Sequence, residues 1–412
     1  MSLAARLAAI LTLGLLVPAA AQAKVCPADV KGLSRRIVSC NANFSLQECR
    51  KAVEAVSCSV YRELASINAV VITVPNDEVR TAEGRLAARP EVRRIAQDRY
   101  RKWIQAAELT LPEFGFPPIK EMVPAFTPSA RAQRPAAADP EQPWGISRVN
   151  AAAAWPKTMG RGVKVAVIDT GIDFTHPDLA ANVKGGFNAT DPNNPDNYKD
   201  DHGHGSHVAG TIAAIRDGKG VAGVAPEASL YAVKVCDSGG GCNDSDIIAG
   251  IEWAVKNKTR IANMSLGSSE GADAIHEAVI AAQKAGLVIM AAAGNDSGGP
   301  VSYPAAYPEA IAVSASNDKD GFAYFSSKGP EVSFIAPGQN IKSVKMGGGY
   351  TTMSGTSMAT PHMTGLAALA VATGAQGFAG VKNALIKAGA KLPGLSDEQQ
   401  GHGLVNAGKL VR

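Results

Sequence analysis

From residue 143 onward the chain alternates short apolar runs with longer amphipathic stretches, and this alternation limits the possible folds more than any other feature. The short runs are rich in Val, Ile and Ala, as buried strands are, and the stretches between them fit helices. This rhythm predicts an α/β fold with a mainly parallel central sheet covered by helices on both faces. The expected strands are 163–168, 230–235, 261–266, 287–292 and 311–314, and the expected helices are 207–215, 245–257 and 271–285.

Three blocks of this region carry side chains suited to acid–base and nucleophilic chemistry. Asp169 ends the first expected strand, and functional groups gather at the carboxyl ends of strands in open parallel sheets. His204 lies near the start of the first expected helix. Ser357 lies among small residues in the block 355–362, ahead of an alanine-rich run, which is typical of a serine at the tip of a buried helix. Taken alone, such a serine is more often a helix N-cap.

Together the three blocks resemble the subtilisin-like serine proteases, or subtilases, over residues 140–412. The order Asp, His, Ser along the chain is known for this family. The resemblance implies a catalytic triad in which Ser357 attacks a peptide carbonyl, His204 takes its proton and Asp169 orients the imidazole. The segment 291–295 resembles the oxyanion segment of the family, which implies that Asn295 and the Ser357 backbone N–H hold the oxyanion.

The expected function is that of a secreted serine endopeptidase of broad specificity, which hydrolyses polypeptides through an acyl-enzyme and is made as an autoprocessed zymogen. Two alternatives remain open at this point. One is an inert subtilase-like binding or scaffold protein, which would not need Asp169, His204, Asn295 and Ser357 together. The other is a processing protease of narrow specificity, which the absence of a long region after the catalytic part disfavours.

The resemblance also implies two edges along which a peptide substrate adds as a strand, and a pocket for one of its side chains. Cys236 and Cys242 bracket the second edge and are expected to form a disulfide that stiffens it. A carboxylate at the pocket rim would make Lys and Arg secondary choices behind large apolar residues. The implied substrate residues are Ser265, Leu266 and Gly267 on one edge, Gly239, Gly240 and Gly241 on the other, Ser302 at the pocket floor and Asp296 at its rim.

A structural Ca²⁺ site is a further implication of the resemblance. The loop 215–221 has the length of the family's calcium loop, and hard oxygen ligands suit this ion. Pro140 stands where the family has a glutamine side chain, and Asp139, Glu141 or Gln142 are the possible substitutes. No cofactor is expected for catalysis. The implied ligands are the carboxylates of Asp178 and Asp217 and the carbonyls of Ile215, Lys219 and Val221.

The N-terminal third indicates export. Residues 1–23 contain one charge, an apolar stretch and an Ala-x-Ala site, as a secretory signal peptide does, and the apolar stretch is too short for a membrane anchor. Six cysteines fit an oxidising compartment, so we expect a secreted protein, with the periplasm as an alternative. Zinc binding is disfavoured because the cysteines lack ligand spacing. We expect a monomer with no membrane association after signal removal.

Residues 24–104 form the expected pro-domain. They carry 15 Lys and Arg against 9 Asp and Glu, whereas residues 140–412 carry 22 against 24, so the two parts are expected to attract each other. Nucleic acid is disfavoured because the basic residues are not massed. A strand at 67–74, a helix at 76–89 and a strand-like run at 91–103 resemble the back half of a subtilase pro-domain, a chaperone and inhibitor whose tail lies in the active-site cleft.

The borders of this pro-domain are less defined. The resemblance places the first cut near Ile104–Gln105, and the Pro- and Ala-rich residues 105–139 are expected to form a linker ahead of the peptidase domain 140–412. The segment from Cys26 to Cys58 has no counterpart in the resemblance and is interpreted as a disulfide-closed helical cap. The pairing of Cys26, Cys40, Cys49 and Cys58 stays open.

Overall fold

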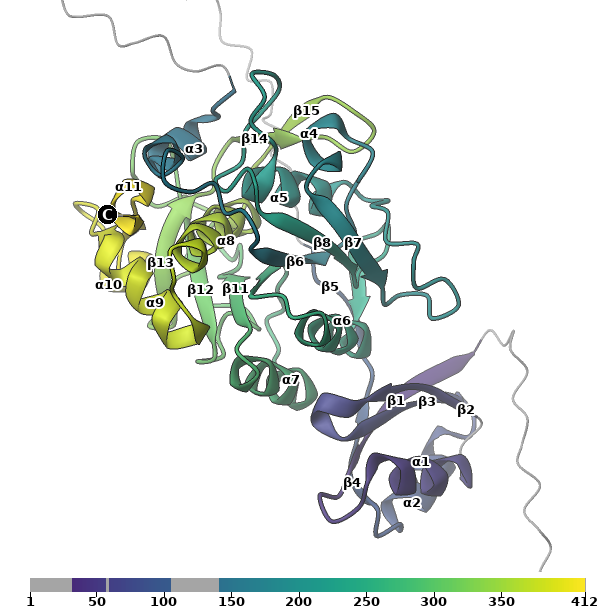
Figure 1. Cartoon of the computed structure of the whole chain (residues 1–412). Coiled ribbons are helices and arrows are strands. Elements are labelled where there is room, and N and C mark those ends of the chain that lie inside the picture. Colours follow the sequence, from purple (N-terminus) through teal and green to yellow (C-terminus); the bar gives the residue numbers. More distant parts are fainter. Residues whose placement is uncertain (1–31, 57–58, 105–140, 412) are drawn as a thin grey trace, which may run out of the picture.

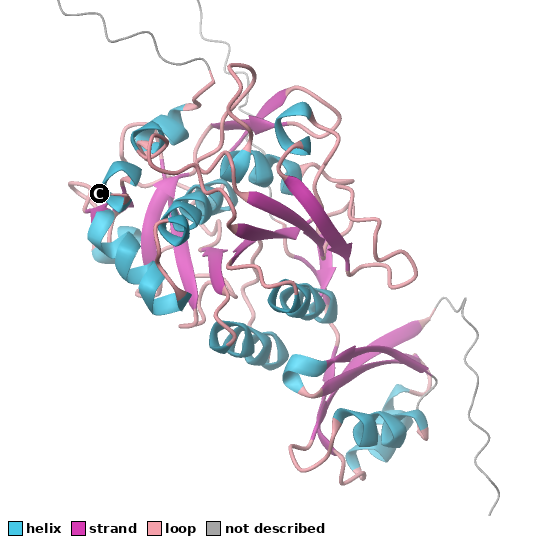
Figure 2. Ribbon diagram, in the orientation of Figure 1, coloured by secondary structure: helices cyan, strands magenta, loops and turns pink. Residues whose placement is uncertain are grey.

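The computed structural model describes residues 32–56, 59–104 and 141–411, which form a large α/β part and a smaller part of four strands and two helices (Figures 1 and 2). The expected signal peptide, the linker 105–139, Cys26 and Cys58 lie outside the described residues. The two parts lie against each other, with the sheet of the smaller one facing helices of the larger one (Figure 1).

A nine-stranded sheet runs through the large part and confirms the predicted α/β class. Its order is β16-β17-β13-β12-β11-β10-β6-β8-β7. All neighbouring strands are parallel except β16 and β17. The strands are β6 Lys164–Asp169, β7 Val183–Asn188, β8 Ser229–Lys234, β10 Ile261–Met264, β11 Val288–Ala292, β12 Ala310–Ser316, β13 Val332–Pro337, β16 Gly389–Ala390 and β17 Leu404–Val405.

Helices cover both faces of this sheet, as the continuous apolar runs predict (Figure 2). Strand β6 shows why: Val165 and Val167 pack into one core cluster with α5 and α8, and Ala166 and Ile168 pack into the other with α6 and α7. None of the described helices is alone long and apolar enough to span a membrane, although the bent pair α8 and α9 meets that test together. The helices are α3 Trp144–Arg148, α4 Pro177–Ala180, α5 His204–Ala213, α6 Asp244–Lys256, α7 Asp273–Lys284, α8 Thr356–Ala372, α9 Gly377–Ala388, α10 Asp397–Gln400 and α11 Ala407–Leu410.

Helix α8 is the central helix of the large part, and its residues 356–370 are all buried. It packs under β10 to β13 and against α5. Pro361 lies inside the helix and has no N–H to donate to the carbonyl of Ser357. The Ser265 hydroxyl donates to that carbonyl instead, at 2.8 Å. The proline is therefore tolerated because a neighbouring loop supplies the missing donor.

Two short antiparallel ladders complete the large part and the cleft beside it. β14 Ile341–Val344 pairs with β15 Tyr350–Met353 and packs on α5. β9 Gly241–Asn243 pairs with β5 Tyr100–Lys102, which comes from the end of the smaller part. The predicted strand-like run at 91–103 is therefore two strands, because β4 Val92–Gln97 stays in the small sheet and β5 leaves it.

The smaller part is a four-stranded antiparallel sheet in the order β2-β3-β1-β4, with α1 and α2 on one face (Figure 1). The predicted disulfide-closed helical cap at its start is only partly right, because α1 and a disulfide are present but β1 is a central strand that pairs on both sides. Its pattern was hidden by Arg35 and Arg36, whose charges are met by partners from outside the strand. Cys40 bonds to Cys49. The elements are β1 Leu33–Cys40, α1 Leu46–Glu54, β2 Ser59–Leu64, β3 Ala69–Pro75, α2 Val79–Ala87 and β4 Val92–Gln97.

Because α8 is fully packed, removing a buried side chain from it is expected to lower the free energy of unfolding strongly. Leu366 is fully buried in the cluster that joins α8 to α5, whereas Leu395 is only half-buried at the edge of a small cluster. Leu366→Ala is expected to lower the free energy of unfolding by about 2–5 kcal/mol, because the removed methyl groups leave a space that the helix cannot close. Denaturant unfolding in the Ser357→Ala background measures this loss. Leu395→Ala is the control and should cost less than half as much; equal losses would contradict the packing.

Candidate active site

Asp169 and His204 form a buried pair at the carboxyl edge of the sheet. Asp169 is the last residue of β6, His204 is the first residue of α5, and their side chains are 0% and 3% exposed. His204 Nδ1 lies 2.8 Å from Asp169 Oδ1, which also accepts the N–H of Thr170. Burial by itself lowers the pKa of His204, but the charge and hydrogen bond of Asp169 outweigh it and the pKa is raised. An ionised Asp169 holds the proton on Nδ1 and leaves Nε2 as the basic nitrogen.

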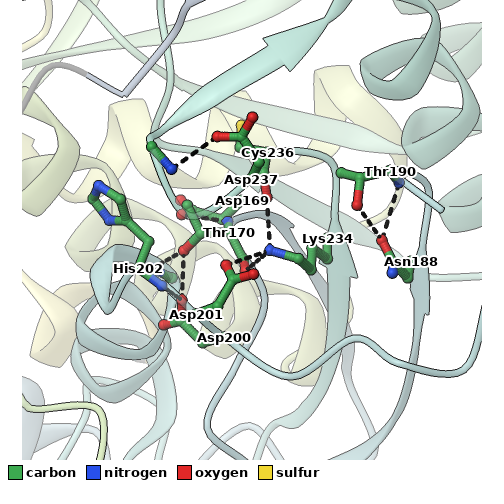
Figure 3. Close-up of polar contacts among 12 residues, drawn as sticks. Asp169, Thr170, Asn188, Thr190, Asp200, Asp201, His202, Lys234, Cys236 and Asp237 are labelled. Atoms are coloured by element: carbon green, nitrogen blue, oxygen red, sulfur yellow. Dashed lines mark hydrogen bonds and ion pairs between the residues drawn. The ribbon is translucent and has the colours of Figure 1, made fainter. Parts of the chain in front are cut away.

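Asp200 fixes the start of helix α5 and was missed by the sequence analysis (Figure 3). Its Oδ1 accepts the Thr170 hydroxyl and the N–H groups of His202 and Gly203, and its Oδ2 accepts the N–H and hydroxyl of Ser206. Of these donors, the N–H groups of Gly203 and Ser206 belong to the start of the helix, where the first N–H groups have no intrahelical partner. An aspartate four residues before the expected catalytic histidine was the available signal for this role.

Lys234 is the second residue that the sequence analysis missed. It ends β8, is 4% exposed, and Figure 3 shows its ammonium group beside Asp201 and the turn after Asp169. Nζ donates to the carbonyl oxygens of Thr170 at 2.9 Å and Cys236 at 2.8 Å and to Asp201 Oδ1 at 2.6 Å. One buried cation thus ties together three segments around Asp169. A lone lysine at the end of an apolar strand was the signal.

Ser357 is the second residue of α8, and its backbone N–H belongs to the first turn, which has no intrahelical acceptor for it. Its hydroxyl donates to the Ser265 carbonyl at 3.0 Å. No hydrogen bond joins Ser357 to His204 in the described structure, and His204 Nε2 is buried there without a hydrogen-bond partner. A rotation of the serine side chain is therefore the movement that would bring nucleophile and base together.

Asn295 lies beside the start of the same helix. Its Oδ1 accepts the N–H of Thr356 at 2.9 Å and the Thr356 hydroxyl at 3.0 Å. These two bonds fix which end of the amide faces the helix, so the Nδ2 group is on the other side. Asn295 and Ser357 line the same cavity, together with Leu266, Gly267 and Ser302, which the sequence predicts as substrate-binding residues. Its lining is Trp103, Leu266, Gly267, Ala292, Gly294, Asn295, Ser302, Thr356 and Ser357.

Asp296, expected at the rim, is not among the residues that line this cavity. It is exposed, and its carboxylate lies against the backbone of Gly299. A Cβ added at Gly299 would lie only 2.2 Å from Asp296 Oδ2. The N–H of Asp296 donates to the Ser327 hydroxyl. Ser302 does line the cavity, and its own N–H donates to the carbonyl of Ala293.

The end of the smaller part occupies the cleft as an extended strand. The N–H groups of Trp103 and Ile104 both lie 3.1 Å from the Gly240 carbonyl, and the N–H of Gly267 donates to the Trp103 carbonyl at 3.0 Å. Both predicted edges therefore contact the same strand. The expected bond between Cys236 and Cys242 is confirmed, and it closes the loop that carries Gly240.

The other histidines near this region have different partners. His207 Nε2 lies 3.0 Å from the Ile341 carbonyl, and burial lowers the pKa of His207 to about 3. His362 Nδ1 lies 2.9 Å from the Met358 carbonyl, and burial lowers its pKa to about 4. The ring of His202 is 6.3 Å from that of His204, centroid to centroid. Among the rings of His202, His204, His207 and His362, only that of His204 forms a hydrogen bond with a carboxylate.

The loop 215–221 lies over buried acidic groups. Asp178 is 4% exposed, and its two oxygens accept the N–H of Val221 at 3.0 Å and the hydroxyl of Tyr350 at 3.2 Å. Burial and then this bond raise the pKa of Tyr350 to about 12. Glu141 reaches the loop from the other side and accepts the N–H of Asp217 at 2.8 Å. No group of three His, Cys, Asp or Glu side chains forms a metal cluster in the described ranges.

The Asp169–His204 contact predicts the ionisation of His204. Asp169→Asn is expected to lower the pKa of His204 by at least about one unit, because the neutral amide no longer favours the imidazolium while burial still opposes it. Titration of the imidazole by NMR in the Ser357→Ala background measures the shift. Asp191→Asn, in an exposed loop, is the matched control and should leave the pKa unchanged. An unchanged value in Asp169→Asn would contradict an ionised Asp169.

Comparison with known proteins agrees with this geometry. Residues 160–403, more than half of the chain, match the model of the Subtilase family. Subtilisin Savinase of Lederbergia lenta is 49% identical over 228 residues, which are 55% of this chain and 83% of that protein. Subtilisin E of Bacillus subtilis is 51% identical over 232 residues, which are 55% of this chain and 60% of that protein. M-protease of Shouchella clausii is 49% identical over 228 residues, which are 55% of this chain and 59% of that protein. The chain belongs to the subtilase family of serine endopeptidases.

Proposed function

We propose that this protein is a secreted endopeptidase made as a self-inhibited zymogen, in which Asp169, His204 and Ser357 act as the catalytic triad. The observation that carries the proposal is the strand 100–104, which lies between Gly240 and Gly267 and ends at the cavity of Ser357. A peptide of the chain itself thus marks the path of a substrate. Export rests on the expected signal peptide.

In this mechanism the Ser357 hydroxyl leaves the Ser265 carbonyl and turns towards His204. Nε2 removes its proton as Oγ attacks the peptide carbonyl, and Asp169 stabilises the imidazolium without taking the proton itself. The imidazolium then protonates the leaving amine, and a water molecule, activated in the same way, hydrolyses the acyl-enzyme. No metal or organic cofactor is needed for these steps.

The negative oxygen of the tetrahedral intermediate needs fixed donors. Two are available beside the serine: the Ser357 N–H at the start of α8 and the Asn295 amide, which Thr356 holds in one orientation. Loss of one such donor lowers the rate by about 10²- to 10³-fold in subtilisin. The alternative of an inert scaffold gives no reason for the bonds that orient this amide.

The pocket supports broad specificity with a preference for large apolar side chains. Leu266, Gly267, Ala292 and Ser302 line it, and we assign the first three to its walls and Ser302 to its floor. None of these residues is charged. Because Asp296 lies outside this lining, the proposal assigns it no part in specificity.

The smaller part supports the role of inhibitor and intramolecular partner through its charges. Asp98 accepts the N–H and hydroxyl of Ser245, and so caps helix α6, whose own N-cap residue Asn243 makes no side-chain cap bond. Around this cap, basic residues of the smaller part meet acidic residues of α6 and α7. The pairs are Arg62 with Asp246, Arg101 with Asp244, Arg93 with Glu277, and Arg94 with Asp273 and Glu277.

We also propose that Ca²⁺ binds at the loop 215–221 and stabilises the fold. Asp178 is buried and Asp217 lies in the loop, and the hydrogen-bond partners of both carboxylates among the described residues are uncharged N–H and hydroxyl groups, so an added cation would balance their charge. Glu141, one of the three possible substitutes for the missing glutamine, reaches this loop. The carbonyl oxygens of Ile215, Lys219 and Val221 remain the expected further ligands.

Autoprocessing predicts the behaviour of Ser357→Ala. This variant is expected to fold and to keep its pro-segment, because the first cut needs the hydroxyl of the same molecule. Intact mass after expression in a protease-deficient host measures this, and a fluorophosphonate probe should label the wild type but not the variant. Ser354→Ala is the control and should mature normally. Maturation of Ser357→Ala at the wild-type rate would contradict autoprocessing, and a wild type that takes up no probe would favour the inert scaffold.

Calcium binding predicts a loss of thermal stability on chelation. At free Ca²⁺ a hundredfold above Kd, binding contributes about 2.7 kcal/mol to the folded state. Removal of the ion should therefore lower Tm in the Ser357→Ala protein, and the effect should shrink in Asp178→Asn and in the milder Asp217→Asn. Asp191→Asn serves as control and should respond to the chelator like the parent. A Tm that no chelator changes would exclude the site.

A further inference from the structure

Arg101 of the pro-segment makes contacts of a kind that its charged neighbours do not. One guanidinium nitrogen, Nη2, donates to Asp244 Oδ1 at 2.7 Å. The other, Nη1, donates to the Ser268 hydroxyl and to the Glu270 carbonyl, each at 2.9 Å. The guanidinium also lies over the ring of Trp103, with Cζ 4.7 Å from the centroid. Its side chain is 17% exposed, and that of Asp244 is 3% exposed.

The three hydrogen-bond acceptors of this guanidinium belong to the catalytic part and come from both edges of the cleft, whereas the Trp103 ring belongs to the pro-segment itself. Asp244 directly follows β9, the edge strand that pairs with β5. Ser268 belongs to the opposite edge, where it directly follows Gly267, whose N–H donates to the Trp103 carbonyl. A side chain at the place of Arg101 therefore bridges the two edges. When the pro-segment leaves, these acceptors stay behind and face the cleft.

Arg99, two residues earlier, provides an internal comparison. It also pairs with a carboxylate, that of Glu270, but the two side chains are 44% and 70% exposed. Ion pairs in solvent contribute little to binding, whereas charge-assisted hydrogen bonds with a buried carboxylate contribute more and depend on geometry. The contact of Arg101 with the catalytic part is therefore specific in its geometry, whereas that of Arg99 is a solvent-exposed ion pair.

We propose that the cleft contains an acidic subsite, formed by Asp244 with the Ser268 hydroxyl and the Glu270 carbonyl, that binds an arginine side chain of the substrate at the place of Arg101. This place is three residues before Ile104, and neither Arg101 nor its three acceptors are among the residues that line the cavity beside Ser357. The subsite deepens the proposed peptidase function and rests on it. It makes basic polypeptides, with arginine on the N-terminal side of the scissile bond, a favoured substrate class.

The chemistry favours arginine over lysine. Three acceptors are arranged around two guanidinium nitrogens, and the flat group stacks on an aromatic ring. An ammonium group is a point charge and cannot meet separated acceptors from both edges at once. The ring on which the guanidinium stacks is that of Trp103, which comes from the bound peptide and is kept in every peptide of the test below. Lysine at this place should therefore rank between arginine and an uncharged side chain.

The test uses fluorogenic peptides with the sequence of residues 98–108, so that the register is that of the pro-segment itself. The first peptide keeps Arg101, the second has citrulline in its place, the third has lysine there, and the fourth has citrulline in place of Arg99. For the processed wild-type enzyme, kcat/KM for the first peptide should exceed that for the second by roughly 10- to 100-fold, because citrulline keeps the shape but loses the charge. Citrulline at Arg99 should change kcat/KM less than about fivefold.

Matched variants assign the effect to Asp244. Asp244→Asn should reduce the ratio between the first two peptides to less than about threefold. Asp273→Asn should keep the wild-type ratio. The two aspartates are both first residues of a helix and both pair with a pro-segment arginine, but Asp273 is 80% exposed and lies outside the cleft.

A second measurement separates this proposal from the peptidase function. Fluorescence anisotropy records the binding of labelled forms of the first two peptides to the same preparations. Cleavage of both peptides at equal rates would overturn the subsite and leave the peptidase function standing. Arginine-selective binding that Asp244→Asn abolishes, without any cleavage, would support the subsite and overturn the peptidase function. Neither cleavage nor binding would overturn both.

Discussion

Helix α8 must be surrounded by protein on all sides, and the large part of the chain is arranged around that requirement. Residues 356–370 are buried without exception, so strands pack on one side of the helix and α5 on another. Only its first turn reaches the cleft. Ser357 and the partner of Asn295, Thr356, are both in that turn. The proposed nucleophile and the proposed oxyanion donors are thus held by the core itself.

Buried charge is the second constraint on this site. Asp169 is fully buried, and a carboxylate in that position is costly unless donors and nearby cations compensate it. Thr170 and His204 supply donors, and Lys234 places a cation on the turn that follows. Asp200, in turn, orders the start of the helix that carries His204. The network explains why this edge of the sheet has so many polar residues with so little exposure.

Local patterns predicted the sheet well, and they indicated that three of the candidate site residues lie at the ends of elements. Continuous apolar runs identify strands buried on both faces, and Asp169 ends one of them, whereas His204 and Ser357 lie in the first turns of two helices. Patterns failed where a distant partner decides the structure. Strand β1 was missed because its arginines are compensated by residues far away in the sequence. The bonds of Lys234, Asp98 and Arg101 join segments that no periodicity connects.

The two-edged cleft has a consequence for the kind of protein that the enzyme can cleave. Backbone hydrogen bonds to both edges hold residues 100–104 as an extended strand. The loop that forms one of these edges is closed by the Cys236–Cys242 disulfide. A helix or a paired strand cannot make these backbone hydrogen bonds without giving up its own. A folded target must therefore first open locally over several residues, and its rate of cleavage reports the free energy of that opening. Flexibility of the target, as much as its sequence, decides where the chain is cut.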